Sequence, residues 1–274
     1  MMGTEHSGKP VLERVPTGVP GLDTILSGGL LRGGIFIVQG SPGAGKTILG
    51  NQICFRHVAN GGRALYVTLL AESHARMLLH IGQLGFFEEK VIPDRLYYIS
   101  AFRVLEEHGL AGMLELLRRE VQAHDVSILV LDGFSAIEDT AASNREFKKF
   151  IHQLQAHAAI ANCTMLLLTG PKPVAAEHTL VDGVIELQTK LHGRRAERSL
   201  QVHKLRGSSY MRGEHSFRIT DDGIIVYPCT EALLAGFSTV DRVIGPPVAT
   251  GIAELDRIMG GGFPHQSTAL LIGP

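Results

Sequence analysis

The sequence predicts an α/β domain with a mainly parallel central sheet, helices on both of its faces and a C-terminal antiparallel β-hairpin region. Three observations predict it: short strands alternate with helix-length segments, these strands are apolar throughout, and after about residue 180 strands follow one another through turns. Strands that alternate with helices form parallel sheets, and strands buried on both faces are apolar at every position. With 274 residues, 45% of them apolar, the chain can bury such a core.

The predicted parallel strands come first along the chain, each followed by helix-compatible sequence. They are Ile35–Val38, Ala64–Leu69, Leu96–Ile99, Ser127–Leu131 and Thr164–Leu168. Ser143 and Glu146 form a capping box, the pattern in which each side chain bonds the other residue's main chain at a helix start. The helix that follows carries an apolar face made of Phe147, Phe150, Ile151 and Leu154.

The later part of the chain favours antiparallel strands. They are Val184–Leu187, Leu200–Leu205, Phe217–Ile219 and Ile224–Tyr227. The last two are separated by Asp221-Asp222-Gly223, residue types that favour a tight turn. The sequence therefore predicts a hairpin region at the end of the sheet.

An internal repeat sets the domain organisation. Val15–Ser41 aligns without gaps with Val248–Pro274 at an offset of 233 residues, and nine of the 27 pairs are identical, where chance gives one or two. The first copy runs into a glycine-rich loop, whereas the second stops where its own loop would begin. We therefore expect a first domain over residues 1–232, a linker over 233–247 and the start of a second such domain over 248–274.

Composition excludes several classes of protein. The 26 Lys and Arg balance 27 Asp and Glu, which argues against a surface that coats nucleic acid or anionic membrane. No apolar run approaches the roughly 18 residues that span a bilayer, and the first ten residues are polar, so we expect a cytoplasmic protein without membrane contact. Neither the three cysteines nor the thirteen histidines show metal-binding spacing.

The most specific motif is a phosphate loop. Its residues are Gly40, Ser41, Pro42, Gly43, Ala44, Gly45, Lys46 and Thr47, which match G-x-x-x-x-G-K-[ST] between a strand and a helix, as the motif requires. Main-chain N–H groups of such a loop surround phosphate oxygens, the lysine reaches the β- and γ-phosphates, and the threonine hydroxyl can ligate Mg²⁺.

Two carboxylates complete the predicted catalytic chemistry. Asp132 ends the apolar strand Ile128–Leu131, so it should reach the ligand-binding edge of the sheet and hold Mg²⁺ opposite Thr47. Glu72 follows the strand Ala64–Leu69 and is our candidate base for activating water. The alternative is that Glu72 only begins the next helix, where an acid is favourable.

Cationic residues gather in one predicted hairpin. Residues 190–212 hold seven Lys and Arg against the single acid Glu197. Lys204 and Arg206 in this hairpin are candidate fingers that stabilise transition-state charge on the nucleotide of a neighbouring subunit. A nucleic-acid patch, with Tyr210 as its only aromatic, and a merely solvated hairpin face are the alternatives.

Taken together, these residues resemble the KaiC branch of the RecA-type ATPases. The resemblance covers Val15 to about Pro228, resumes at Val248, and rests on the glycines before the phosphate loop, on Asp132, and on two segments, Asp182–Ile185 and Lys204–Glu214. It implies a homo-oligomeric ring, usually a hexamer, with ATP and Mg²⁺ at subunit interfaces, two tandem units and a regulatory protein partner. The implied nucleotide-binding set is the phosphate loop with Ile48, together with Lys204, Leu205 and Arg206.

The chain departs from the family pattern at two positions. Ala71 precedes Glu72 where two adjacent Glu are usual, and Tyr210 replaces a common His. Slow turnover is therefore expected. Three functions compete: a ring-forming ATPase that acts as a regulatory switch, a nucleotide-gated scaffold with little hydrolysis, and a RecA-like DNA-binding ATPase. Serine/threonine autokinase activity belongs to the second unit of the family's clock members, so it is expected only of a full-length tandem protein.

Overall fold

The computed structural model describes residues 12–69, 74–171, 179–234, 245–265 and 267–273. The chain divides into two compact units, Met1–Leu233 and Leu234–Pro274, and each is described here by itself. No helix in the described ranges is both long enough and apolar enough to cross a membrane.

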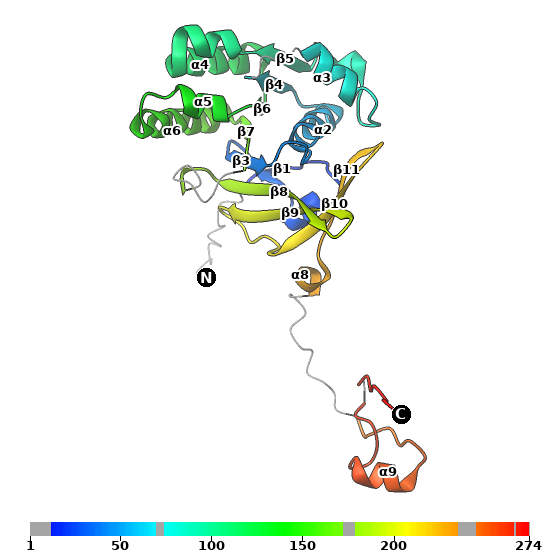
Figure 1. The fold of residues 1–274 in the computed structure, drawn as a ribbon. Helices are drawn as coiled ribbons and strands as arrows, with labels where there is room; N and C mark the ends of the chain where they lie inside the picture. The colour runs from blue at the N-terminus through cyan, green and yellow to red at the C-terminus, as the bar shows by residue number, and fades with distance from the viewer. Residues whose placement is uncertain (1–11, 70–73, 172–178, 235–244, 266, 274) are drawn as a thin grey trace, which may run out of the picture. The chain divides into compact units, whose positions relative to one another are not determined.

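The first unit alternates strands and helices along most of its length (Figure 1). Its elements are β1 (Arg14–Val15), α1 (Leu22–Ile25), β2 (Leu30–Leu31), β3 (Ile35–Gly40), α2 (Lys46–Ala59), β4 (Ala64–Thr68), α3 (His74–Ile81), the 3₁₀ turn η1 (Glu89–Val91), β5 (Leu96–Ser100), α4 (Phe102–His124), β6 (Ile128–Asp132), α5 (Ser135–Thr140), α6 (Asn144–Ala161), β7 (Thr164–Thr169), β8 (Gly183–His192), β9 (Arg195–Leu205), β10 (Glu214–Thr220), β11 (Gly223–Tyr227) and α8 (Thr230–Leu234).

Within the described ranges, nine strands form the large sheet in the order β11-β10-β9-β8-β3-β7-β6-β4-β5. From β8 to β5 neighbouring strands are parallel, whereas β9, β10 and β11 pair antiparallel. The predicted α/β fold is therefore confirmed, with its parallel strands first and its antiparallel strands last. The short strands β1 and β2 pair separately, next to α1.

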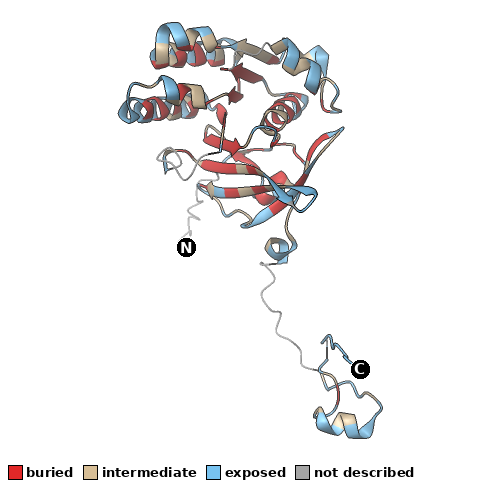
Figure 2. Ribbon diagram, in the orientation of Figure 1, coloured by how far each residue is buried: buried red, intermediate tan, exposed pale blue. Residues whose placement is uncertain are grey.

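The inner parallel strands β3, β4, β6 and β7 are buried at every residue because helices cover both faces of this part of the sheet (Figure 2). Phe36, Val38 and Leu166 belong to one buried cluster with residues of α2. Ile35, Ile37 and Leu167 belong to a second cluster with residues of α4 and α6. Residues that alternate along β3 thus enter different cores, as the period of two in a strand requires. Half of the predicted capping box is present: Glu146 N donates to Ser143 Oγ, whereas the Glu146 carboxylate accepts from Ala142 N instead of Ser143 N.

The β8–β9 hairpin is longer than the sequence predicted. Its strands have ten and eleven residues, whereas the apolar segments predicted only Val184–Leu187 and Leu200–Leu205. The additional residues are mostly polar or charged and partly exposed. Their main chains pair with each other, and main-chain pairing leaves no hydrophobic pattern in the sequence. The predicted turn is correct, because Thr220 pairs with Gly223 across Asp221 and Asp222.

The second unit contains one helix, α9 (Ala253–Ile258), within its described residues. A single bridge joins Val248 to Phe263 around it. Thr250 N and Thr250 Oγ1 both donate to Asp256 Oδ1, each at 2.7 Å. The same contacts occur in the first unit, where Val15 pairs with Leu30 and Thr17 donates to Asp23.

Candidate functional site

The phosphate loop joins the end of β3 to the start of α2. Gly45 has φ of 102° and directly precedes Lys46, the first residue of the helix. A Cβ at Gly45 would lie 3.0 Å from Ile219 Cδ1, whereas a Cβ at Gly43 would meet nothing within 4 Å. The first N–H groups of α2 have no partner inside the helix and point into the loop. The loop thus presents main-chain donors around open space, which is the arrangement that binds phosphate.

Lys46 lies inside this loop. Its Nζ donates to Gly40 O at 2.6 Å and to Ser41 O at 3.0 Å. Burial lowers the pKa of its ammonium group, and the nearby charge of Asp132 opposes this. Main-chain carbonyls of the loop therefore occupy two of the three ammonium donors.

Thr47 and Asp132 meet beside the loop. Thr47 Oγ1 donates to Asp132 Oδ2 at 2.9 Å, and Asp132 is only 7% exposed. Asp132 is the last residue of β6, which lies two strands from β3 in the sheet. Both strands end at the same edge because they run parallel, so the sheet brings together two residues that are 85 positions apart.

A third side chain, which the sequence did not single out, also contacts Asp132. Tyr66 Oη donates to Asp132 Oδ2 at 2.8 Å. Tyr66 lies on β4 two residues before Thr68, whose register partner is Asp132. Only the pairing of β4 with β6 places the phenol there, so no local pattern in the sequence could have found it.

The candidate base, Glu72, lies outside the described residues. The strand before it ends at Thr68, and the described part of the chain resumes at His74. Thr68 Oγ1 and His74 Nε2 are 2.8 Å apart. Burial lowers the pKa of His74, while a hydrogen bond with the main chain of Ile99 opposes this. Thr68 on β4 and His74 on α3 are thus in contact, and Thr68 is the register partner of Asp132.

Lys204 and Arg206 lie at the other edge of the sheet. Leu205 pairs with Gly183, and Gly183 pairs with Phe36, four residues before Gly40 on β3. At about 3.3 Å per residue, these four residues place the two cations roughly 13 Å from the phosphate loop along the strand direction. They also lie on β9, two strands from β3 in the sheet. Neither side chain can bridge that distance, so the structure does not bring them to the phosphate loop of their own chain.

Carbonyl groups of the preceding segment hold both cations. Lys204 Nζ donates to Thr179 O at 3.0 Å, and Arg206 donates to Thr179 O at 2.7 Å and to Leu180 O at 3.3 Å. Burial lowers the pKa of Lys204, as does Arg206. Leu205 between them is only 7% exposed and belongs to the apolar core, so any contact it makes with a nucleotide has to come from its main chain.

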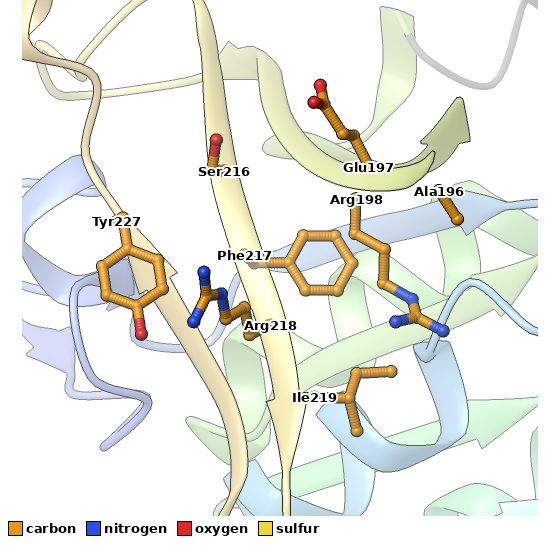
Figure 3. A pocket seen from close by; sticks show the side chains of 8 residues that line it. All are labelled: Ala196, Glu197, Arg198, Ser216, Phe217, Arg218, Ile219 and Tyr227. Carbon is orange, nitrogen blue, oxygen red and sulfur yellow. The ribbon is translucent and has the colours of Figure 1, made fainter. Parts of the chain in front are cut away.

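A cleft opens between β9 and β10 (Figure 3). The two strands pair only from Glu214 to Ser216 and then separate. The cleft has a volume of about 620 Å³, and the residues that line it are Ala196, Glu197, Arg198, Ser216, Phe217, Arg218, Ile219 and Tyr227. Ile219 also faces Gly45. No described residue accepts a hydrogen bond from the buried Arg198 Nε.

Comparison with known proteins identifies the family. A family model described as the KaiC ATPase matches residues 15–231. This chain belongs to the KaiC family of ATPases. Its relatives include the circadian clock oscillator protein KaiC of Picosynechococcus, 26% identical over 96% of this chain and 52% of the relative, and KaiC2 of Synechocystis, 28% identical over 98% and 49%. The chain thus spans about half the length of these KaiC relatives.

A solved structure shows the same fold. It is that of a KaiC-like protein from the archaeon Pyrococcus horikoshii, with a TM-score of 0.70 and 23% identity, and the match covers 80% of this chain and 100% of that one. At this identity it supports the KaiC fold alone. Across the described residues there is no group of three or more His, Cys, Asp or Glu side chains that could hold a metal ion.

Proposed function

We propose that this chain binds ATP with Mg²⁺ in the loop Gly40–Thr47 and hydrolyses it slowly within a ring of identical subunits. The observation that carries the proposal is that Lys46 and Thr47 of the loop lie beside Asp132 at the end of β6, so that a cation, a hydroxyl and a carboxylate are in place. Membership of the KaiC family supports it. Lys46 would neutralise charge on the transferred phosphate, and Glu72 would orient the attacking water.

The residues present fit Mg²⁺. Hydroxyl and carboxylate oxygens are the ligands this ion prefers in proteins, with the remainder supplied by phosphates and water. Thr47 and Asp132 would hold the ion. When bound, it neutralises charge that develops on the β- and γ-phosphates.

The cleft between β9 and β10 supports a place for the nucleoside. It adjoins Gly45 through Ile219 and holds the buried Nε of Arg198. We propose that the base lies there, where an acceptor atom on the base or ribose would accept a hydrogen bond from Arg198 Nε.

The position of Lys204 and Arg206 supports a ring. They cannot reach their own phosphate loop, so a role on the nucleotide requires a neighbouring copy of the chain. A closed ring, with six subunits as in our expectation, gives each phosphate loop such a neighbour.

We further propose that residues 1–232 are the ATPase domain, 233–247 the linker and 248–274 the start of a second such domain. The assembly would serve as a regulatory switch that a protein partner recognises.

Calorimetry with ATP in magnesium buffer tests the binding step. Lys46→Ala should weaken binding at least about tenfold, because it removes the charge-assisted contact to phosphate. Arg145→Ala, an exposed cation on α6, is the matched control and should leave the affinity unchanged. Equal affinities for the wild type and Lys46→Ala would reject the proposal.

Mixed rings test whether the cations act between subunits. Lys46→Ala and Arg206→Ala chains should each be inactive alone. A mixture should recover part of the ATPase activity, since a loop from one variant then meets an intact Arg206 of the other. No recovery in mixtures that still assemble, by mass measurement with ATP and Mg²⁺, would contradict a role in the neighbouring site.

A nucleotide-gated scaffold is the second candidate, and Ala71 before Glu72 favours it. Phosphate release from the wild type and Glu72→Gln separates the two functions. Turnover that depends on Glu72 identifies an ATPase, whereas ATP-dependent assembly without turnover in either protein identifies the scaffold.

A further inference from the structure

Two tyrosines, one buried and one partly buried, lie behind the start of α2, on neighbouring strands of the sheet. Tyr66 on β4 is 0% exposed, and its ring lies 5.5 Å from that of Tyr98 on β5. Their hydroxyl groups have different partners. Tyr66 Oη donates to Asp132 Oδ2, whereas Tyr98 Oη donates to Asn51 Oδ1 at 2.7 Å within the packing of α2 against the sheet.

The contact between Tyr66 and Asp132 is a charge-assisted hydrogen bond away from solvent. Burial and the charge of Asp132 raise the pKa of Tyr66 well above its ordinary value, so the phenol keeps its proton and acts as a donor. The same carboxylate oxygen accepts from Thr47 Oγ1. Two donors therefore fix Oδ2 and with it the rotation of the carboxylate.

This arrangement determines which oxygen atoms could bind a metal. Thr47 Oγ1 donates its only hydrogen bond to Asp132, so the lone pairs of its hydroxyl face away from the carboxylate. Asp132 Oδ1 is the second oxygen of the same group. Without the phenol, Oδ2 would keep one donor, and the carboxylate could turn about its terminal bond.

We propose that Tyr66 is a positioning residue, which holds the carboxylate of Asp132 in the orientation that a Mg²⁺–nucleotide complex requires. The inference rests on the proposed function, and it adds a residue on a third strand to the site. Groups that orient metal ligands in this way typically contribute a factor of about 10 to 100 in metal affinity.

The test is Tyr66→Phe, which removes one oxygen atom and keeps the ring in the core. ATP affinity is measured by calorimetry over a series of Mg²⁺ concentrations and without the ion. We expect the Mg²⁺ concentration that gives half of the full affinity gain to rise about tenfold. Affinity without Mg²⁺ should stay the same, because the loop and Lys46 are intact.

Tyr98→Phe is the matched variant. It removes a partly buried hydroxyl from the neighbouring strand, and one that bonds an amide rather than the carboxylate. A merely structural loss would lower the melting temperature of both variants and leave both Mg²⁺ midpoints at the wild-type value. The proposal requires that only Tyr66→Phe shifts the midpoint.

The outcomes separate the two levels of inference. A wild-type chain that needs Mg²⁺ for full ATP affinity, with the same midpoint in Tyr66→Phe, overturns the role of Tyr66 and leaves the proposed function standing. No ATP binding by the wild type overturns both. In Asp132→Asn, addition of Tyr66→Phe should cause no further shift, since the carboxylate is already gone.

A spectroscopic measurement covers the case in which Tyr66→Phe does not fold. The chain has five tyrosines and no tryptophan, so the aromatic side chains that contribute to the long-wavelength part of its near-ultraviolet spectrum are tyrosines. Addition of Mg²⁺ to the ATP-saturated Tyr98→Phe protein should perturb a buried tyrosine, because the charge next to Tyr66 is then shared with the ion. An unchanged spectrum would overturn the inference.

Discussion

The two copies of the repeat, residues 15–41 and 248–273, make the same local contacts in different surroundings. In the first, Asp23 Oδ1 accepts from Thr17 N and Thr17 Oγ1, both at 2.8 Å. In the second, Asp256 Oδ1 accepts from Thr250 in the same way. A helix follows in both, and a strand bridge closes both at equivalent residues. A short sequence is therefore enough to build this turn.

Burial separates the copies. Ile25 is 0% exposed, whereas the equivalent Ile258 is 78% exposed. Val38 is buried in β3 between two helical layers, whereas the equivalent Leu271 is 84% exposed and belongs to no strand. The first copy packs against β11, where Val226 N donates to Pro20 O. The difference teaches that this segment forms its turn alone but forms its strand only with a sheet beside it.

The largest expected effect comes from the identical isoleucines. Ile25→Ala should destabilise the first unit by about 4 kcal/mol, since it leaves a cavity in a closed core. Ile258→Ala should change the free energy of unfolding by less than about 0.5 kcal/mol. Chemical denaturation of both variants measures this, and similar losses would mean that the second copy is packed in solution.

The aspartates that accept from Thr17 and Thr250 should differ less. Asp23→Ala removes the acceptor of three hydrogen bonds, from Thr17 N, Thr17 Oγ1 and Gly18 N, and should cost about 2 kcal/mol. Asp256→Ala should leave the melting temperature of the first unit unchanged and shift only the amide resonances of Thr250 and its neighbours. A melting temperature that falls equally in both variants would contradict the comparison.

Lowering the pH should reduce the stability of the first unit before it disturbs the contact between Thr250 and Asp256 in the second unit. Burial, with a contribution from the charge of Arg32, lowers the pKa of His57 from 6.5 to about 4. The unfolded chain therefore binds a proton that the folded chain does not, and stability present above pH 6.5 is lost progressively as the pH falls toward 4. The expected drop is about 3 °C in melting temperature between pH 7 and 5.

His57→Gln is the control for this acid effect, because its side chain does not titrate, and its melting temperature should vary less over the same range. Asp256 should stay ionised throughout. Hydrogen bonds from Thr250 lower its pKa below the ordinary value of 3.8, so the Thr250 amide resonance should not move until the pH falls further. If the Thr250 amide resonance moved over the same pH range as the melting temperature, the two units would not differ in their response to acid.

The smallest effect is expected in the exposed segment that corresponds to β3. Leu271→Ser should not change the free energy of unfolding, because the side chain is already in water. A measurable loss of stability would show that this segment packs against something in solution.

Prediction from sequence was strongest where the signal was local. The phosphate loop, the strand that ends in Asp132, the helix cap at Ser143 and the turn before Gly223 all follow from neighbouring residues. The long β8–β9 hairpin did not follow, because paired strands of charged residues have no apolar pattern. The contact of Tyr66 with Asp132 also escaped, since it depends on which strands are neighbours.

The sequence by itself determined the elements of this protein: glycines that allow the loop, apolar runs that become strands, and a Thr–Asp pair that forms a turn in either copy. These features are determined by backbone sterics and by hydrogen bonds between residues that are close in the sequence. The tertiary structure alone decided which edge each side chain reaches. It set Asp132 and Tyr66 beside Thr47, and Lys204 and Arg206 at the opposite edge, because strand order and register are set by the packing of whole layers.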